Sequence, residues 1–104
     1  MNETILQNRI RAAIAALPDA RVWRNNNGLD RERGVRYGLG KGSPDLIGIV
    51  DGRFIGLEVK MPRGRVSPEQ AMWVNTILRL GGSAGVVRSV DEALALVDEA
   101  RRWR

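Results

Sequence analysis

The stretch that decides the fold of this chain is Gly42–Lys60, which reads GSPDLIGIVDGRFIGLEVK. It contains two apolar runs, Asp45–Val50 and Arg53–Val59, which are rich in residues typical of strands. Between them lies Asp51-Gly52, a pair that favours a two-residue turn between antiparallel strands. The stretch therefore predicts a β-hairpin.

The register of this hairpin brings two carboxylates together. With a two-residue turn, Val50 faces Arg53, and counting outward places Asp45 directly opposite Glu58. Directly opposed residues hold their Cβ atoms roughly 4.5 to 5.5 Å apart on one face of the sheet. Two carboxylates at that separation repel each other unless a cation lies between them. A three-residue turn would shift the register and separate them.

Alternation of side chains adds an ammonium group to the same patch. Lys60 projects from the same face as Glu58, while the side chain of Val59 points away. Carboxylate and carbonyl oxygens suit Mg²⁺ or Mn²⁺. We therefore expect Asp45, Glu58 and the backbone carbonyl of Val59 to hold such an ion. The alternative is that the two acids are solvated charges at strand ends, although both strands look apolar on both faces.

The same residues carry a family resemblance. Pro44-Asp45, followed by Glu58-Val59-Lys60, resembles the signature of the PD-(D/E)xK nuclease superfamily. The wider pattern, which begins at Gly42-Ser43 and continues to Ser67-Pro68-Glu69-Gln70, resembles the virus-type replication-repair nuclease (VRR-NUC) family over nearly the whole chain. The resemblance implies a restriction-endonuclease-like core and cleavage of DNA that leaves a 5′-phosphate and a 3′-hydroxyl.

Two further residues have both a structural and a functional interpretation. Gln70 follows Ser67 at capping-box spacing, so it caps its own helix, whereas the resemblance makes it a catalytic residue that orients Lys60 or the attacking water. Glu3 stands in the first turn of a predicted helix and complements the helix dipole there. Related nucleases often carry a glutamate on this helix that reaches the metal, which makes Glu3 a candidate ligand.

Composition limits the chemistry that is available. The chain has 104 residues, which we expect to form one domain over residues 1–104, and it contains neither histidine nor cysteine. The usual zinc ligands, Ser-His-Asp triads and thiol chemistry are thereby excluded. The net charge of +5 favours a polyanion, with nucleic acid first and an anionic membrane surface second. No apolar run is long enough to span a membrane, and we expect an intracellular, cytoplasmic protein.

The N-terminal part predicts a helix, a strand and a basic loop. Apolar residues at helical spacing predict a helix over residues 2–17, and residues 20–24 predict a strand. Residues 25–41 have no periodicity, so we expect a structureless loop that lies along a phosphate backbone. The candidate DNA contacts are Arg31, Arg33, Arg36, Tyr37 and Lys41 in this loop, and Arg63 and Arg65 after the hairpin. The alternative is a solvated loop whose arginines bind nothing.

The C-terminal part predicts a second helix, a strand and a third helix. A helix follows Ser67 and ends at Leu80 before two glycines, and residues 84–88 predict a strand parallel to its neighbour. Ser89 and Glu92 predict a second capping box, and residues 101–104 form a basic tail that we interpret as a frayed helix end. The order α-β-β-β-α-β-α predicts an α/β fold with a mixed four-stranded sheet flanked by helices.

Together these features predict a Mg²⁺- or Mn²⁺-dependent DNA endonuclease. Small stand-alone members of the family are similar to Holliday-junction resolvases, and this similarity implies a homodimer that acts on branched DNA. The alternative is a DNA-binding module that keeps the nuclease fold without catalysis. A structural protein that binds an acidic partner is the least favoured reading, because it gives the paired carboxylates no role.

Overall fold

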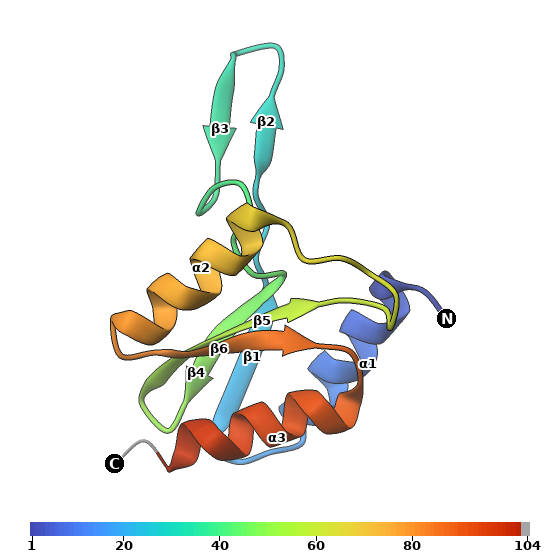
Figure 1. Cartoon of the computed structure of the whole chain (residues 1–104), viewed down its shortest axis with the longest axis vertical. Helices are drawn as coiled ribbons and strands as arrows, with labels where there is room; N and C mark the ends of the chain where they lie inside the picture. The colour runs from blue at the N-terminus through green and yellow to red at the C-terminus, as the bar shows by residue number, and fades with distance from the viewer. Residues whose placement is uncertain (103–104) are drawn as a thin grey trace.

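A mixed four-stranded sheet forms the centre of the computed structural model, which describes residues 1–102 (Figure 1). Trp103 and Arg104, the end of the predicted basic tail, lie outside the described residues. In chain order the elements are α1 (Glu3–Ala15), β1 (Ala20–Arg24), β2 (Gly28–Asp30), β3 (Val35–Tyr37), β4 (Leu46–Val50), β5 (Arg53–Val59), α2 (Pro68–Arg79), β6 (Ser83–Val87) and α3 (Val90–Arg101). The strand order in the central sheet is β1-β4-β5-β6.

The predicted hairpin is β4–β5, and its register is the predicted one. Val50 pairs with Arg53 and Leu46 pairs with Leu57. The turn residues Asp51 and Gly52 have φ values of 48° and 84°, which are the left-handed values that a two-residue hairpin turn requires. Strand β1 pairs antiparallel with β4, and β6 pairs parallel with β5, as the crossover through α2 predicted.

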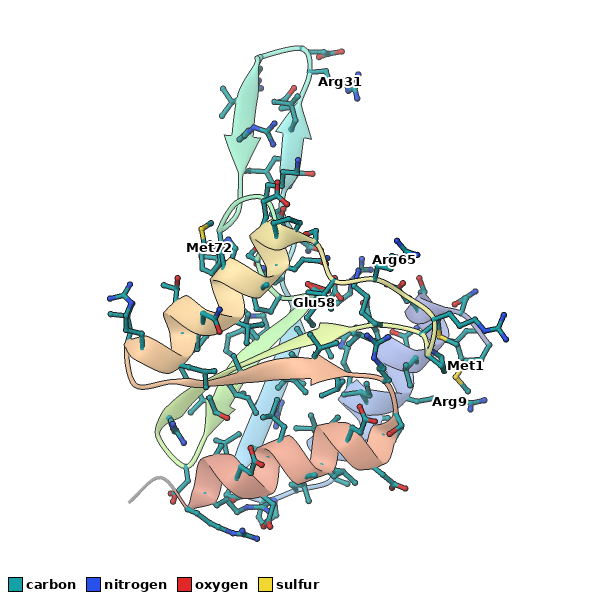
Figure 2. The ribbon with its side chains drawn as sticks, in the orientation of Figure 1. Met1, Arg9, Arg31, Glu58, Arg65 and Met72 are labelled. Carbon is teal, nitrogen blue, oxygen red and sulfur yellow. The ribbon has the colours of Figure 1, made fainter. Side chains whose placement is uncertain are left out.

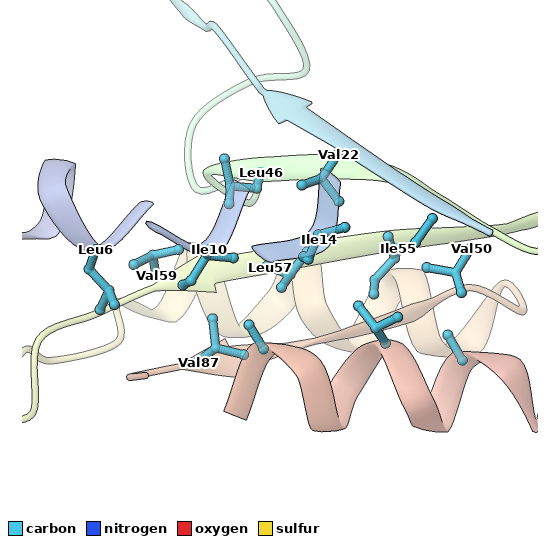
Figure 3. Packing of buried hydrophobic residues seen from close by; sticks show 14 residues of the cluster. Leu6, Ile10, Ile14, Val22, Leu46, Val50, Ile55, Leu57, Val59 and Val87 are labelled. Carbon is cyan, nitrogen blue, oxygen red and sulfur yellow. The ribbon is translucent and has the colours of Figure 1, made fainter. Parts of the chain in front are cut away.

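Alternation along the strands divides the sheet into two differently covered faces. Helices α1 and α3 cover one face, where fourteen buried apolar residues form the core (Figure 3). Helix α2 lies on the other face, where Ile77 packs beside Gly56. Because Leu57 and Val59 are completely buried in the core, Glu58 between them must point toward the α2 face.

Helix starts follow the predicted caps, with one exception. Ser67 and Gln70 form the predicted reciprocal capping box on α2. At α3 the Ser89 hydroxyl accepts from the backbone N–H of Glu92, but the Glu92 carboxylate accepts from the N–H of Arg88 instead of returning to Ser89. The second capping box is therefore only half formed. The first helix ends at Ala15, two residues before the predicted end.

The prediction of a structureless loop over residues 25–41 was wrong. Strands β2 and β3 form a separate two-stranded hairpin that projects beyond the body of the molecule (Figure 1). Its turn is closed by the Asp30 carboxylate, which accepts from the backbone N–H groups of Glu32 and Arg33. Each strand has only three residues, and both faces are solvated, so no hydrophobic alternation marks them in the sequence. We call residues 27–38 the β2–β3 arm.

The interpretation of the basic tail as a frayed end was also wrong at Arg101. Its guanidinium binds the Asp19 carboxylate through two bonds of 2.7 and 3.0 Å, and so fastens the end of α3 to the segment before β1. The hydrogen bond from Arg101 lowers the pKa of Asp19. Among the described residues, no helix is both long and apolar enough to cross a lipid bilayer.

Substitution of Gly48 tests how closely the backbones of β1 and β4 approach each other. A Cβ at Gly48 would collide with the Arg21 carbonyl oxygen and come within 2.8 Å of the Val22 Cα, and neither backbone atom can move aside. We expect Gly48→Ala to lower the free energy of unfolding by about 2 kcal/mol or more, measured by urea denaturation. In the control Gly85→Ala, the new methyl meets only Leu96 at 3.5 Å, so its unfolding midpoint should stay close to that of the wild type.

Candidate metal-binding active site

The site is centred on Glu58, which lies near the end of β5 (Figure 2). The residue is only 2% exposed, although it faces neither solvent nor the apolar core. The paired register of β4 and β5, extended by one residue, places Asp45 opposite it. Asp45 stands one residue before β4 rather than within it, which moves the predicted strand start by one position. The two predicted carboxylates are therefore brought together.

Burial and its neighbours hold Glu58 in its protonated form. The pKa of Glu58 is raised to about 9, first by burial and then by a hydrogen bond and charge repulsion from the Asp45 carboxyl. The positive charge of Lys60 opposes this shift, and the negative charge of Glu3 adds to it. Two carboxylates in so dry a position cannot both carry charge unless a cation is present. The arrangement therefore has the electrostatics of a candidate cation site.

Backbone groups fix the position of Asp45. Its Oδ2 accepts from the backbone N–H of Val59 at 2.9 Å, and its carbonyl accepts from the N–H of Asn25 at the same distance. The Asn25 side chain donates to the Ser43 hydroxyl at 2.8 Å and to the Pro44 carbonyl at 2.9 Å. Asn25 therefore clamps the segment that leads into Asp45. Sequence reasoning missed this role, because the pairing of β1 with β4 that creates it is not visible in the sequence.

The segment before Asp45 is also anchored to α2. Gly42 has a φ of 85° and packs against Glu69, so no other residue fits there without strain. The indole N–H of Trp73 donates to the Lys41 carbonyl at 3.1 Å, and the Lys41 ammonium lies 3.7 Å from the Glu69 carboxylate. Because this ion pair is exposed to solvent, it contributes little to the stability of the segment. Backbone conformation and packing thus explain why the family signature has a glycine at Gly42.

Gln70 has a clear structural role. The side-chain Oε1 of Gln70 accepts from the backbone N–H of Ser67 at 2.8 Å, while the backbone N–H of Gln70 donates to the Ser67 hydroxyl at 3.1 Å. The amide oxygen is therefore occupied by the helix cap. Only the NH₂ end of this side chain is left to serve as a donor toward Lys60 or a water molecule.

The position of Glu3 gives only partial support to its predicted role as the third acidic ligand. It stands in the first turn of α1, half-buried, and its charge raises the pKa of Glu58. Within residues 1–102, however, no three acidic side chains form a group arranged to hold a metal ion. A site in this part of the chain would rest on Asp45 and Glu58, with the Val59 carbonyl as the candidate third oxygen. Those donors fit Mg²⁺ or Mn²⁺ rather than a soft metal.

The predicted DNA contacts fall into three groups, of which Lys41 alone lies in the segment before Asp45, beside the Glu69 carboxylate of α2. Four of them, Arg31, Arg33, Arg36 and Tyr37, lie on the β2–β3 arm, with Arg31 at its outer end (Figure 2). Arg63 and Arg65 lie in the segment between β5 and α2. Sequence reasoning missed Arg88, whose guanidinium shapes that segment by donating to the carbonyls of Met61 at 2.7 Å and Gly64 at 2.9 Å.

These features define a nuclease-type α/β fold with two adjoining carboxylates and a lysine at the end of a hairpin. The model of the VRR-NUC domain family matches residues 2–91, so the chain belongs to this nuclease-related family. The structure is similar to a solved "VRR_NUC domain protein" with a TM-score of 0.73 and 16% identity, covering 100% of this chain and 91% of that one. No curated protein sequence matches the chain.

The raised pKa of Glu58 predicts how stability depends on pH. Because the folded protein keeps this proton up to a pKa of about 9, while the unfolded chain releases it near 4.5, the free energy of unfolding should fall as pH rises between those values. Urea denaturation at pH 5 and pH 8, with a chelator present, measures the fall. Glu58→Gln should lose this dependence, whereas Glu32→Gln on the exposed arm should keep it. Parallel profiles for wild type and Glu58→Gln would contradict the assignment.

Proposed function

We propose that this protein is a Mg²⁺- or Mn²⁺-dependent endonuclease that hydrolyses phosphodiester bonds in DNA. The observation that carries the proposal is the burial of Glu58 beside Asp45, because a protein gains nothing in stability from two carboxyls in one dry position. Membership of the VRR-NUC family supports the same reading. Cleavage would leave a 5′-phosphate and a 3′-hydroxyl, as in related nucleases.

Each residue of the site has a distinct task in this proposal. Asp45, Glu58 and the Val59 carbonyl would hold the ion, with Glu3 nearby to adjust the charge. The bound ion supplies Lewis acidity to the scissile phosphate and lowers the pKa of an attacking water. Lys60, on the same face of the sheet as Glu58, would position that water and stabilise negative charge that develops on the phosphoryl oxygens. The NH₂ end of Gln70 would hold Lys60 or the water in orientation.

The main rival is a DNA-binding module without catalysis. Both proteins would bind DNA in a salt-dependent manner, so binding alone does not separate them. The rival gives no purpose to a complete set of Asp45, Glu58 and Lys60. A protein that binds an acidic partner through its basic surface leaves the same residues unexplained. Cleavage that requires Mg²⁺ or Mn²⁺ and stops on addition of a chelator favours the nuclease.

Lys60→Ala separates catalysis from binding. We expect the wild type to cleave at least one of a panel of junctions, flaps, nicked duplexes and single strands when Mg²⁺ or Mn²⁺ is added. Lys60→Ala should reduce the rate by at least about a hundredfold, because it loses a group that acts on the reacting water. Its affinity for the same DNA should stay within about threefold of the wild type, since one phosphate contact at most is lost. Unchanged turnover in the variant would remove Lys60 from the mechanism.

The proposed enzyme is a homodimer that acts on branched DNA. One physical feature supports self-association: the α2 face of the sheet is left uncovered over β1 and β4. Trp23, Ile49 and Phe54 project from this face and remain 45%, 50% and 40% exposed. Contiguous exposed apolar side chains mark interaction surfaces in proteins. A two-fold dimer would present two sites to the two strands of a branched substrate.

Ile49→Glu tests the dimer. A charge in the centre of the uncovered face should convert a dimer into a monomer, measured by sedimentation velocity at micromolar concentration, because a buried unpaired carboxylate opposes association. Ala95→Glu adds the same charge on the exposed side of α3 and should leave the dimer intact. A wild type that sediments as a monomer would remove the dimer from the proposal and leave the nuclease standing.

A further inference from the structure

The β2–β3 arm has a surface that the rest of the chain does not use. Its strands pair only with each other, and Leu29, Val35 and Tyr37 are between 43% and 54% exposed. A two-stranded hairpin is marginally stable in water by itself. These apolar side chains are therefore largely exposed to solvent, and the two strands that carry them pair with no other strand.

The two faces of the arm differ in chemistry. Leu29 and Arg36 are directly paired and share one face, while Tyr37 and Val35 project from the other. The Tyr37 ring lies across Gly28, where an added Cβ would come within 2.8 Å of the ring carbon Cζ. One side of the ring is thus held against the backbone, and the residue as a whole remains 54% exposed. The arm therefore offers an exposed aromatic surface whose ring lies against Gly28 of the paired strand.

Residues 27–38 carry three arginines against Asp30 and Glu32, which gives a net charge of +1 that favours an anionic occupant. Arg33 lies 3.8 Å from Asp30, whose carboxylate also closes the turn. In the part of the chain that the structure describes, Arg31 and Arg36 form no salt bridge with a carboxylate. A ribbon of two strands is narrow enough to enter the major groove of duplex DNA, which is about 12 Å wide. Positive charge and this shape together fit a DNA groove.

The base of the arm is joined to the segment that carries Asp45. Asn27 donates to the Ser43 hydroxyl at 3.3 Å, and Asn25, at the end of β1, donates to the same hydroxyl at 2.8 Å. Gly38 also packs directly on the backbone of Asn26 and Asn27. The arm and the Asp45 carboxylate are consequently positioned by one hydrogen-bonded group. The direction of the arm from the site is therefore set by the fold.

We propose that the β2–β3 arm enters a groove of duplex DNA beside the cleavage point, so that a paired flank is required for efficient cleavage. This inference rests on the proposed nuclease function and adds the form of its substrate. At about 3.3 Å per residue, the six steps from Asn25 to Arg31 reach about 20 Å. Measured along a duplex at about 3.4 Å per base pair, that length equals about six base pairs.

The first experiment measures binding without cleavage. All proteins carry Lys60→Ala, and the probes are a duplex and a single strand of equal length. Arg31→Gln with Arg36→Gln should weaken duplex binding about tenfold and reduce the slope of log Kd against log salt by about 2, because two phosphate neighbours are lost. Single-strand binding should change much less. The matched control, Arg9→Gln with Arg79→Gln, removes the same charge from exposed residues of α1 and α2 that form no salt bridge among the described residues.

Three outcomes of this binding experiment would overturn the inference. The first is an equal loss of duplex affinity in the control pair, and the second is an equal loss of affinity for single strands. The third is a change from dimer to monomer in the arm variant, which would show that the arm binds a second copy of the chain. A Lys60→Ala parent that binds none of the probes would refute the nuclease proposal together with this one. Thermal melting of each variant checks that exposed substitutions leave the fold intact.

The second experiment measures cleavage in the chain with Lys60 restored. The substrates are two branched DNAs that differ only in the paired flank, which is about four base pairs in one and about ten in the other, on either side of the expected reach. Wild type should cleave the longer flank faster, and the arm variant should cleave both at similar rates. Equal rates for wild type would show that the nuclease is active and that the arm does not read the flank.

Discussion

The repulsion between two carboxyls at one dry position is the constraint on which the structure around the site depends. Glu58 is buried near the end of β5, and its burial, together with the neighbouring Asp45, raises its pKa to about 9. Burial of an acid without compensation destabilises a fold, so the elements around the pair must hold it in place. The β4–β5 turn sets the register, and Asn25 fixes the segment before Asp45. Strongly perturbed pKa values of this kind are typical of functional sites, which is why the pair supports the proposed metal site.

The arrangement of the helices around the sheet explains why Glu58 and Lys60 lie outside the apolar core. Helices α1 and α3 complete the core on one face, which leaves α2 to cover only part of the other. Glu58 and Lys60 therefore emerge on a face that is neither fully packed nor fully open. The same incomplete cover exposes Trp23 and Phe54 farther along the sheet. One packing asymmetry thus produces both the polar site and the apolar surface that supports the proposed dimer.

The β2–β3 arm is an element that hydrophobic patterns in the sequence do not reveal. A strand is recognised from its sequence when one face is buried, because burial imposes alternation. Strands β2 and β3 are short and solvated on both faces, so their composition resembles that of a loop. The Asp30 side chain closes the turn through local hydrogen bonds that no apolar pattern announces. The arginines were identified in the sequence, but the two-stranded hairpin that carries them was not.

The β4–β5 hairpin, its register and the opposed positions of Asp45 and Glu58 could all be predicted from the sequence alone, because turn chemistry and period-two alternation are local properties. The capping box at Ser67 could be predicted for the same reason. The role of Asn25, which holds the segment before Asp45 in place, became visible only in the folded structure. Contacts of that kind join residues far apart in the chain, and they follow from the packing of β1 against β4 rather than from any neighbouring pattern.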